Sequence, residues 1–144
     1  MIQADELESW CDAELDPGHF SDYCPNGLQV EGTRPVRRLA TGVTACQALL
    51  DAALAWDADA ILVHHGYFWR GEPEPLTGMK GRRVRTLMQN GVSLLAYHLP
   101  LDAHPVHGNN ARLGELLGFE DADATAAGDG LLWRARLSEP LDAD

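Results

Sequence analysis

Residues 60–66 read AILVHHG, and residues 92–102 read VSLLAYHLPLD. Each stretch begins with an apolar run, which is typical of a strand buried on both faces of a sheet, and each run leads to histidine. Helical patterns lie before and between these strands. The alternation predicts βαβ units, and therefore an α/β fold with a mostly parallel sheet flanked by helices.

The segments around these two strands extend the same pattern. We predict strands at residues 28–30, 39–43, 60–63, 92–97 and 131–137, and helices at 2–15, 44–56, 79–90 and 109–117. Thr44 is expected to cap its helix, Gly91 to end the next one, and Pro100 to prevent a regular continuation after residue 97. The Gly- and Pro-rich segment 66–78 is a predicted loop.

Length and composition describe one soluble globular domain. The chain has 144 residues, of which 45% are hydrophobic, with a formal net charge of −11. Nucleic-acid binding is disfavoured, because it depends on basic residues that neutralise phosphates. The charged N-terminus has no signal-peptide pattern, and no apolar run is long enough to span a membrane. Three cysteines without a CxxC motif indicate a reducing compartment, so we expect a cytoplasmic protein.

Potential metal ligands follow the two buried strands. His64 and His65 end the first, and His98 and Asp102 follow the second. The carboxyl ends of parallel strands share one edge of a sheet, where ligands of open α/β sheets bind. Imidazole and carboxylate suit zinc, iron, manganese, cobalt or nickel. The alternative is that these are ordinary histidines at the edge of a sheet.

The histidine pair imposes a geometric condition. Neighbouring residues in a strand point to opposite faces, so we expect His64 and His65 to serve one site only if the chain leaves the strand there. Gly66 makes such a departure easy. The two rings could then face two neighbouring metals, which would activate a water and clamp a phosphoryl or carbonyl oxygen.

Other candidates have ordinary explanations beside the functional ones. A basic cluster, Lys80, Arg82, Arg83 and Arg85, could attract an anionic substrate or could be a solvated helix face. Phe68 and Trp69 could stack on a base, although packing or a subunit contact is more common. His104 and His107 are expected to be exposed. The chain has no phosphate-binding glycine motif and no recognisable nucleophile motif.

Three long stretches resemble the NIF-three-like family, whose members are often named GTP cyclohydrolase I type 2 homologues. They are NGLQVEG (26–32), ILVHHGYFWRGEPEPLTGMKGRR (61–83) and AYHLPLDAHPVHGNNARLGELLG (96–118). The resemblance covers nearly all of residues 1–137. It implies a dinuclear metal centre in a toroidal homohexamer. It also implies that His64 binds one metal and that His65 and Asp102 bind the other. His98 would be an outer ligand or a proton-transfer group.

The sequence departs from that family in one respect. The family continues into a second half, which brings a further histidine and a glutamate that bridges both metals, whereas the last histidine here is His107. We therefore expect residues 1–137 to form the N-terminal part of the family fold, followed by an acidic, truncated end at 138–144. With fewer ligands, the site should bind metal more weakly or with more water.

Three functions follow as hypotheses. The first is a metal-dependent hydrolase that acts on a nucleotide or a related phosphorylated, anionic small molecule through a metal-activated water. The second is a non-catalytic metal-binding protein with an assembly or regulatory role. The third is a structural fragment whose site holds no metal. The residues do not select between catalysis and binding alone.

Overall fold

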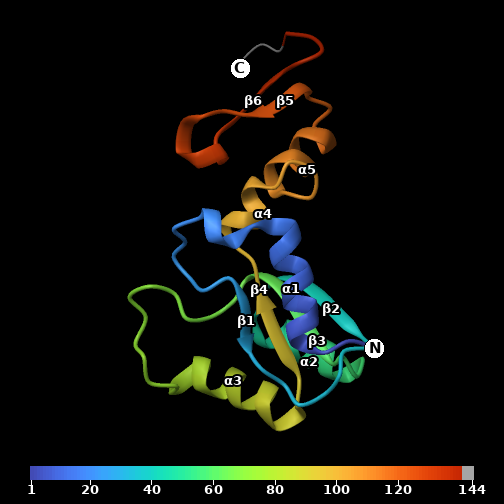
Figure 1. The fold of residues 1–144 in the computed structure, drawn as a ribbon, viewed down its shortest axis with the longest axis vertical. Helices are drawn as coiled ribbons and strands as arrows, with labels where there is room; N and C mark the ends of the chain where they lie inside the picture. The colour runs from blue at the N-terminus through green and yellow to red at the C-terminus, as the bar shows by residue number, and fades with distance from the viewer. Residues whose placement is uncertain (141–144) are drawn as a thin grey trace. The chain divides into compact units, whose positions relative to one another are not determined.

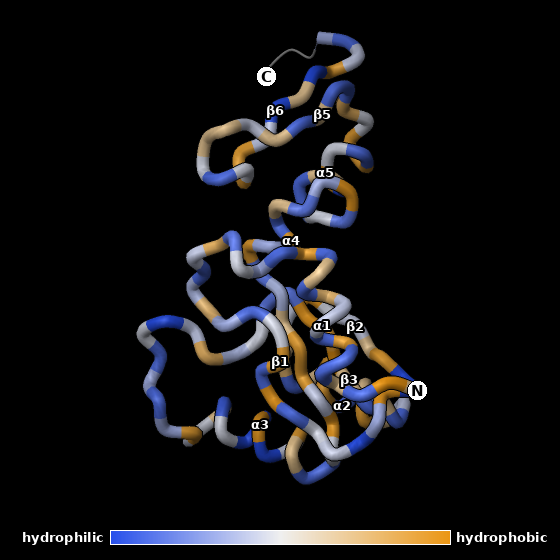
Figure 2. Tube along the Cα trace, viewed as in Figure 1, coloured by the Kyte–Doolittle hydropathy of each residue, from blue (hydrophilic) through white to orange (hydrophobic). Residues whose placement is uncertain are grey.

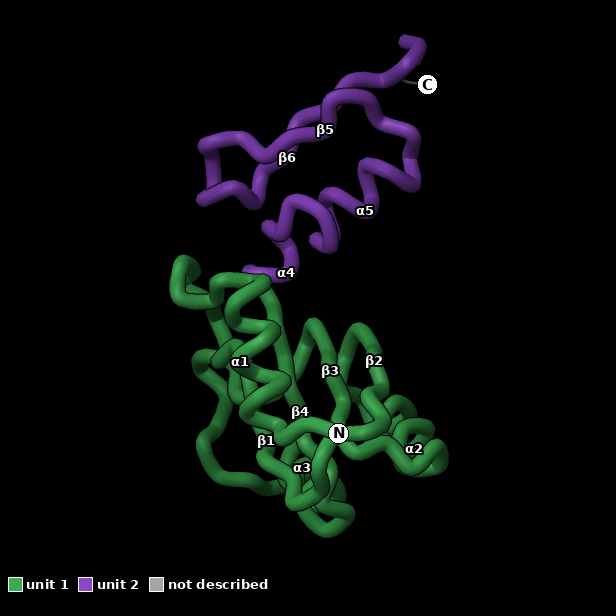
Figure 3. Tube along the Cα trace, turned by 45° about the vertical axis from the view of Figure 1, so that its right-hand side comes forward, with its two compact units in different colours: residues 1–98 green, residues 99–144 purple. Residues whose placement is uncertain are grey.

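A computed structural model describes residues 1–140 of the chain; residues 141–144, the end of the predicted acidic segment, lie outside the described residues. The chain forms two compact units (Figure 3), the first spanning Met1–His98 and the second beginning at Leu99. Each unit has its own small sheet. The boundary between them directly follows His98, one of the candidate site residues.

The first unit is built on a four-stranded sheet with the strand order β1-β4-β3-β2 (Figure 1). Strands β2, β3 and β4 are parallel, and β1 is antiparallel to β4. In chain order the elements are α1 (Ala4–Leu15), η1 (Pro17–His19), β1 (Gly27–Val30), β2 (Leu39–Thr44), α2 (Gln47–Ala55), β3 (Ala60–His65), α3 (Gly78–Asn90) and β4 (Ser93–Ala96). The predicted α/β fold with a mostly parallel sheet is therefore confirmed.

Apolar side chains explain why β3 and β4 occupy the middle of this sheet. Ile61 in β3 and Leu94 and Leu95 in β4 have no exposed surface, and both strands carry strongly apolar residues (Figure 2). Helices α2 and α3 cover one face with the buried residues Leu50 and Leu87, among others. A strand covered on both faces must be apolar throughout, and this gives the sheet a rigid core beneath its carboxyl edge.

Tyr97 links helix α1 to the end of β4. Its hydroxyl donates a hydrogen bond to Asp12 Oδ1 at 2.6 Å, and its ring is almost fully buried. Burial and this hydrogen bond raise the pKa of the Tyr97 phenol, so it remains a donor.

Replacing Tyr97 with phenylalanine should therefore lower the free energy of unfolding by about 1 kcal/mol, because Asp12 loses its donor. Urea unfolding at neutral pH measures the change, with Tyr23→Phe as the control on an exposed ring. Equal stability of the two variants would contradict this assignment.

Asp59 fixes the opposite edge of the sheet, just before β3. Its Oδ2 accepts hydrogen bonds from the backbone N–H groups of Arg37 (2.9 Å) and Arg38 (3.0 Å), and its Oδ1 lies 2.8 Å from the Arg34 guanidinium. Burial acts to raise the pKa of the Asp59 carboxyl, but the two backbone donors and Arg34 outweigh it, so that pKa is lowered.

A lowered folded-state pKa means that the Asp59 carboxylate stabilises the fold at neutral pH and loses this effect as the pH falls below its ordinary pKa of about 4. Asp59→Asn should therefore reduce the free energy of unfolding at pH 7, and the difference from wild type should shrink below about pH 4. Urea titrations at several pH values measure this. Asp57→Asn, which changes an exposed partner of the same arginine, should have little effect.

The second unit contains two helices and a two-stranded antiparallel sheet. Its elements are α4 (Leu99–Ala103), α5 (Asn109–Leu116), β5 (Glu120–Ala124), η2 (Ala127–Gly130) and β6 (Trp133–Arg136). Asn110 Nδ2 donates to the carbonyl of Leu131 at 2.9 Å, which ties α5 to the segment before β6. Among the helices of residues 1–140, none combines the length and the apolar character needed to cross a bilayer.

Local expectations were wrong at four points. Thr44 does not cap α2, because it is the last residue of β2 and the N-cap position belongs to Cys46. Trp10 and Met88 have the spacing of an apolar helix face, which favours burial, but they are 67% and 61% exposed. Pro100 does not end regular structure, since it lies within helix α4; proline is tolerated in a first turn, where the N–H groups have no partner within the helix.

Candidate metal centre

Three histidines meet at the carboxyl edge of the parallel strands. His64 and His65 end β3, and His98 follows β4 by two residues. Each histidine offers one ring nitrogen, and these atoms all lie within 4.8 Å of one another. The ring centroid of His64 lies 4.3 Å from that of His65 and 4.9 Å from that of His98. We call this group the histidine cluster, and its spacing is short enough to hold a metal ion.

The chain leaves β3 directly after the histidine pair, at Gly66, the glycine expected to allow this departure. Strand β3 itself continues through His65, which is paired with Thr44 of β2. The two rings nevertheless approach each other. An imidazole at the end of a strand is long enough to reach over the edge of the sheet, so opposite faces do not keep the ring nitrogens apart.

Each ring of the cluster has its Nδ1 engaged by another group. His64 Nδ1 lies 3.0 Å from the carbonyl of Tyr97, His98 Nδ1 lies 2.7 Å from Asp22 Oδ1, and His65 Nδ1 lies 3.2 Å from Thr44 Oγ1. A carbonyl and a carboxylate only accept, so His64 and His98 carry a proton on Nδ1. Their Nε2 atoms then carry the free lone pairs, which could bind a metal or accept a proton. Metal-binding histidines commonly have such an outer partner, which fixes the tautomer and the ring orientation.

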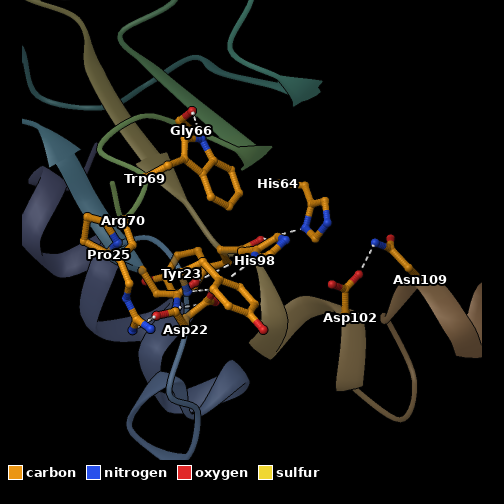
Figure 4. A network of polar contacts seen from close by, with 12 residues as sticks. Asp22, Tyr23, Pro25, His64, Gly66, Trp69, Arg70, His98, Asp102 and Asn109 are labelled. Atoms are coloured by element: carbon orange, nitrogen blue, oxygen red, sulfur yellow. Dashed lines mark hydrogen bonds and ion pairs between the residues drawn. The ribbon is translucent and has the colours of Figure 1, made fainter. Parts of the chain in front are cut away.

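His98 is held at two points by the turn that precedes β1 (Figure 4). Its ring donates to Asp22, while its backbone N–H donates to Asn26 Oδ1 at 2.7 Å. Asn26 Nδ2 in turn donates to Asp22 Oδ2 at 2.9 Å, and the Asp22 side chain is only 3% exposed. The sequence had indicated only a turn here. These two residues were missed because no periodic pattern marks a turn that bonds to a residue more than seventy positions away.

A second group of potential ligands consists of Asp22, Cys24 and His98. It suits a metal less well than the histidine cluster. Burial first, and then the neighbouring Asp22 carboxylate, raise the pKa of the Cys24 thiol to about 11. Because a metal binds the thiolate and not the thiol, Cys24 is poorly prepared to ligate. Asp22 also already serves His98. Within residues 1–140 the three cysteines are free.

Asp102 lies in helix α4 of the second unit, where its Oδ1 accepts a hydrogen bond from Asn109 Nδ2 at 2.6 Å. Its participation in metal binding therefore stays a prediction. His107 is exposed and His104 partly so, and their rings stack on each other 5.1 Å apart. In the basic cluster, Lys80 bonds to the Pro73 carbonyl, while Arg82 and Arg85 are exposed on α3.

Trp69 and Gly66 shape the loop that follows the histidine pair. The Trp69 ring meets His98 edge to face at 4.9 Å, and its Nε1 donates to the Gly66 carbonyl at 3.2 Å. At Gly66 a Cβ atom would lie 2.1 Å from Gln29 Oε1 and 2.7 Å from the Cβ of the buried Ala96, so a larger residue would force its neighbours to move. Gln29 Oε1 also accepts the N–H of Tyr67 at 2.7 Å. The backbone therefore turns away from β3 against a fixed neighbour.

The fold and the cluster together define a class: α/β proteins with imidazole side chains gathered at the carboxyl edge of a parallel sheet. A comparison with protein families identifies the family to which the chain belongs. The chain belongs to the Duf34/NIF3 (NGG1p interacting factor 3) family, whose model matches residues 2–144. The resemblance drawn from the three sequence stretches is thereby confirmed.

Individual relatives agree with this membership. Proteins named GTP cyclohydrolase 1 type 2 homolog are 58% identical in Allochromatium vinosum and 55% identical in Pseudomonas aeruginosa, over 98% and 97% of this chain. The crystal structure of TTHA1606 from Thermus thermophilus is 44% identical, with a TM-score of 0.80, over 87% of this chain and 52% of its own. This chain covers 56% of each of the first two relatives, so it spans about half their length.

Proposed function

We propose that this protein binds two divalent metal ions and hydrolyses a nucleotide or a related phosphorylated small molecule. The convergence of the His64, His65 and His98 ring nitrogens within 4.8 Å carries the proposal. His64 would ligate one ion, and His65 with Asp102 would ligate the other. Zinc, iron, manganese, cobalt and nickel all accept this combination of imidazole and carboxylate.

The cluster fits a metal in two further respects. His64 is 9% exposed and His98 has a 15% exposed side chain, so the ring nitrogens lie at the edge of the buried core. The Nδ1 atoms of both rings face acceptors, which keeps the Nε2 lone pairs available in the neutral form of each ring. Pre-oriented imidazoles avoid the ordering cost that flexible ligands would incur on binding.

A bound divalent ion supplies two things in such a site: a water acidified to near neutral pH and a positive charge for the substrate oxygen. The chain supplies the rest. His64 and His65 would hold the ions, and the Trp69 ring packs edge to face against His98 at 4.9 Å. Asp22 keeps the Nδ1 proton of His98 in place, so Nε2 can accept a proton from the attacking water and release it to the leaving group.

A variant of His98 can show whether this residue is a proton carrier or a metal ligand. In the His98→Ala variant we expect hydrolysis to fall about 10²- to 10⁴-fold, while the metal content changes little. Metal analysis and steady-state assays on the same preparation measure both quantities. Loss of the metal together with activity would instead make His98 a ligand and would leave the proton carrier to be found elsewhere.

One experiment tests the function as a whole. The chain is purified without chelators, its metal content is measured, and the protein with added Mn²⁺ or Zn²⁺ is assayed on a panel of nucleotides and phosphoesters. We expect bound metal and a metal-dependent turnover of at least one member. Bound metal without turnover would favour the alternative, a non-catalytic metal-binding assembly or regulatory protein. A chain without metal would overturn both.

The family resemblance also leads us to propose a homo-oligomer in the form of a hexameric ring. Native mass spectrometry of the same preparation tests this, with a mass six times that of the chain as the expected result.

A further inference from the structure

Three side chains beside the histidine cluster form an aromatic and basic rim, which we define as Tyr23, Trp69 and Arg70. We propose that this rim binds a heteroaromatic phosphate, with the ring of the ligand on Trp69 and its anionic group at Arg70. The inference rests on the proposed function and deepens it, because it assigns the recognition of the substrate to residues outside the metal centre.

Trp69 is the inner member of the rim. Its ring centroid lies 4.9 Å from that of His98 and 6.0 Å from that of His65, so it adjoins the ring nitrogens that would hold metal. The hydrogen bond from Nε1 to the Gly66 carbonyl fixes the indole in the loop, and the residue remains partly exposed. A fixed, accessible indole is a platform on which a planar heterocycle stacks with little loss of side-chain freedom.

Arg70 and Tyr23 are the outer members (Figure 4). The Arg70 guanidinium lies 5.8 Å from the centroid of the Tyr23 ring and donates to the Asp22 carbonyl at 2.9 Å. The Arg70 backbone N–H donates to the Tyr23 carbonyl at 2.7 Å, which joins the two loops. Tyr23 is 57% exposed and Arg70 is also exposed. The guanidinium is therefore oriented without being enclosed.

The charge of Arg70 is the feature that indicates an anionic ligand. Within residues 1–140 no carboxylate pairs with its guanidinium, although the chain has twice as many acidic as basic residues. The Asp22 carboxylate, whose backbone carbonyl accepts from Arg70, faces His98 and Asn26 instead, and the Glu72 carboxylate, two residues along the chain, pairs with Lys80. Arginine donors in a fixed fork suit a phosphate, which they bind through charge-assisted hydrogen bonds.

The arrangement of the rim indicates where each end of the ligand would bind. Trp69 contacts the histidines directly, whereas Arg70 donates to the backbone carbonyl of Asp22, whose carboxylate in turn contacts His98. A ligand that uses both would place its heterocycle beside the histidine cluster and its phosphate farther out. A nucleoside monophosphate has this form, while a sugar phosphate has no ring to stack on Trp69.

Equilibrium dialysis of the protein with added Mn²⁺ tests the proposal with three probes: adenosine 5′-monophosphate, adenosine and ribose 5-phosphate. We expect the monophosphate to bind more tightly than either other probe. Trp69→Leu should weaken the monophosphate and adenosine alike, by about tenfold. Arg70→Gln should weaken only the monophosphate, by a similar factor. Trp10→Leu and Arg85→Gln, on exposed helix faces, are the matched controls and should change nothing.

The metal content of each variant, measured in parallel, separates this proposal from the proposed function. Wild-type metal content with unchanged monophosphate binding in Trp69→Leu would overturn the rim and leave the metal centre intact. Equal binding of ribose 5-phosphate and the monophosphate would also overturn it. The dialysis is repeated after removal of metal with EDTA. Binding that persists there and still depends on Trp69 supports the rim even if the chain proves to hold no metal.

Discussion

Replacing His64 and His65 together with alanine is expected to abolish metal binding and, with it, hydrolysis. The two rings supply adjacent ring nitrogens of the cluster, and alanine cannot ligate. Loss of an outer partner alone weakens metal binding about 10- to 100-fold, so the loss of two direct ligands should exceed about 100-fold. Metal content after dialysis against a fixed concentration of free Mn²⁺ measures the effect.

The control for this double variant is His19→Ala. His19 is an exposed histidine in the same unit and lies outside the cluster, in η1. It should keep the wild-type metal content and activity. Circular dichroism of the double variant establishes that the fold persists. If the folded double variant kept its metal, the histidine cluster would not be the metal centre.

Replacing Gly66 with alanine is expected to have the second largest effect. The added Cβ would lie 2.1 Å from Gln29 Oε1 and 2.7 Å from the Cβ of Ala96 in β4. Ala96 is fully buried, so the loop must move, and overpacking of this kind costs about 1–3 kcal/mol. The displaced loop also carries Trp69 and follows His65 directly, so metal binding should weaken as well.

Urea unfolding and metal analysis of Gly66→Ala measure the two effects. The matched control is Gly18→Ala, where the nearest heavy atom to a new Cβ is 3.9 Å away and the backbone is not in the left-handed region. That variant should be about as stable as wild type. A Gly66→Ala protein with unchanged stability would mean that Gln29 yields easily and that the loop is not held as tightly as its contacts indicate.

The core of the first unit could be predicted from sequence because burial leaves a strong pattern. The apolar runs at residues 60–63 and 92–97 predicted β3 and β4, and the glycine at 91 marked the end of α3, where its φ is +64°. By contrast, β5 was missed. Its sequence, EDADA, is mostly exposed and lacks the apolar residues that identify a strand, so its pairing with β6 could not be predicted.

The candidate site was predictable to the extent that it depends on strand ends. His64, His65 and His98 were expected at one edge, and the structure brings them together. Asp22 and Asn26 were not foreseen, because their contacts with His98 join segments far apart in the chain. For the histidine pair, strand alternation describes the directions in which the two side chains start, whereas metal binding depends on the final positions of their ring nitrogens.

The position of Trp69 also gives the site an optical reporter. The chain has four tryptophans, of which Trp10 and Trp56 are largely exposed and Trp133 belongs to the second unit. The Trp69 ring contacts the rings of His65 and His98 in the histidine cluster. A bound ion with unpaired electrons would quench its emission at this range. In a variant with phenylalanine at the other three positions, fluorescence would follow occupancy of the cluster directly and in real time.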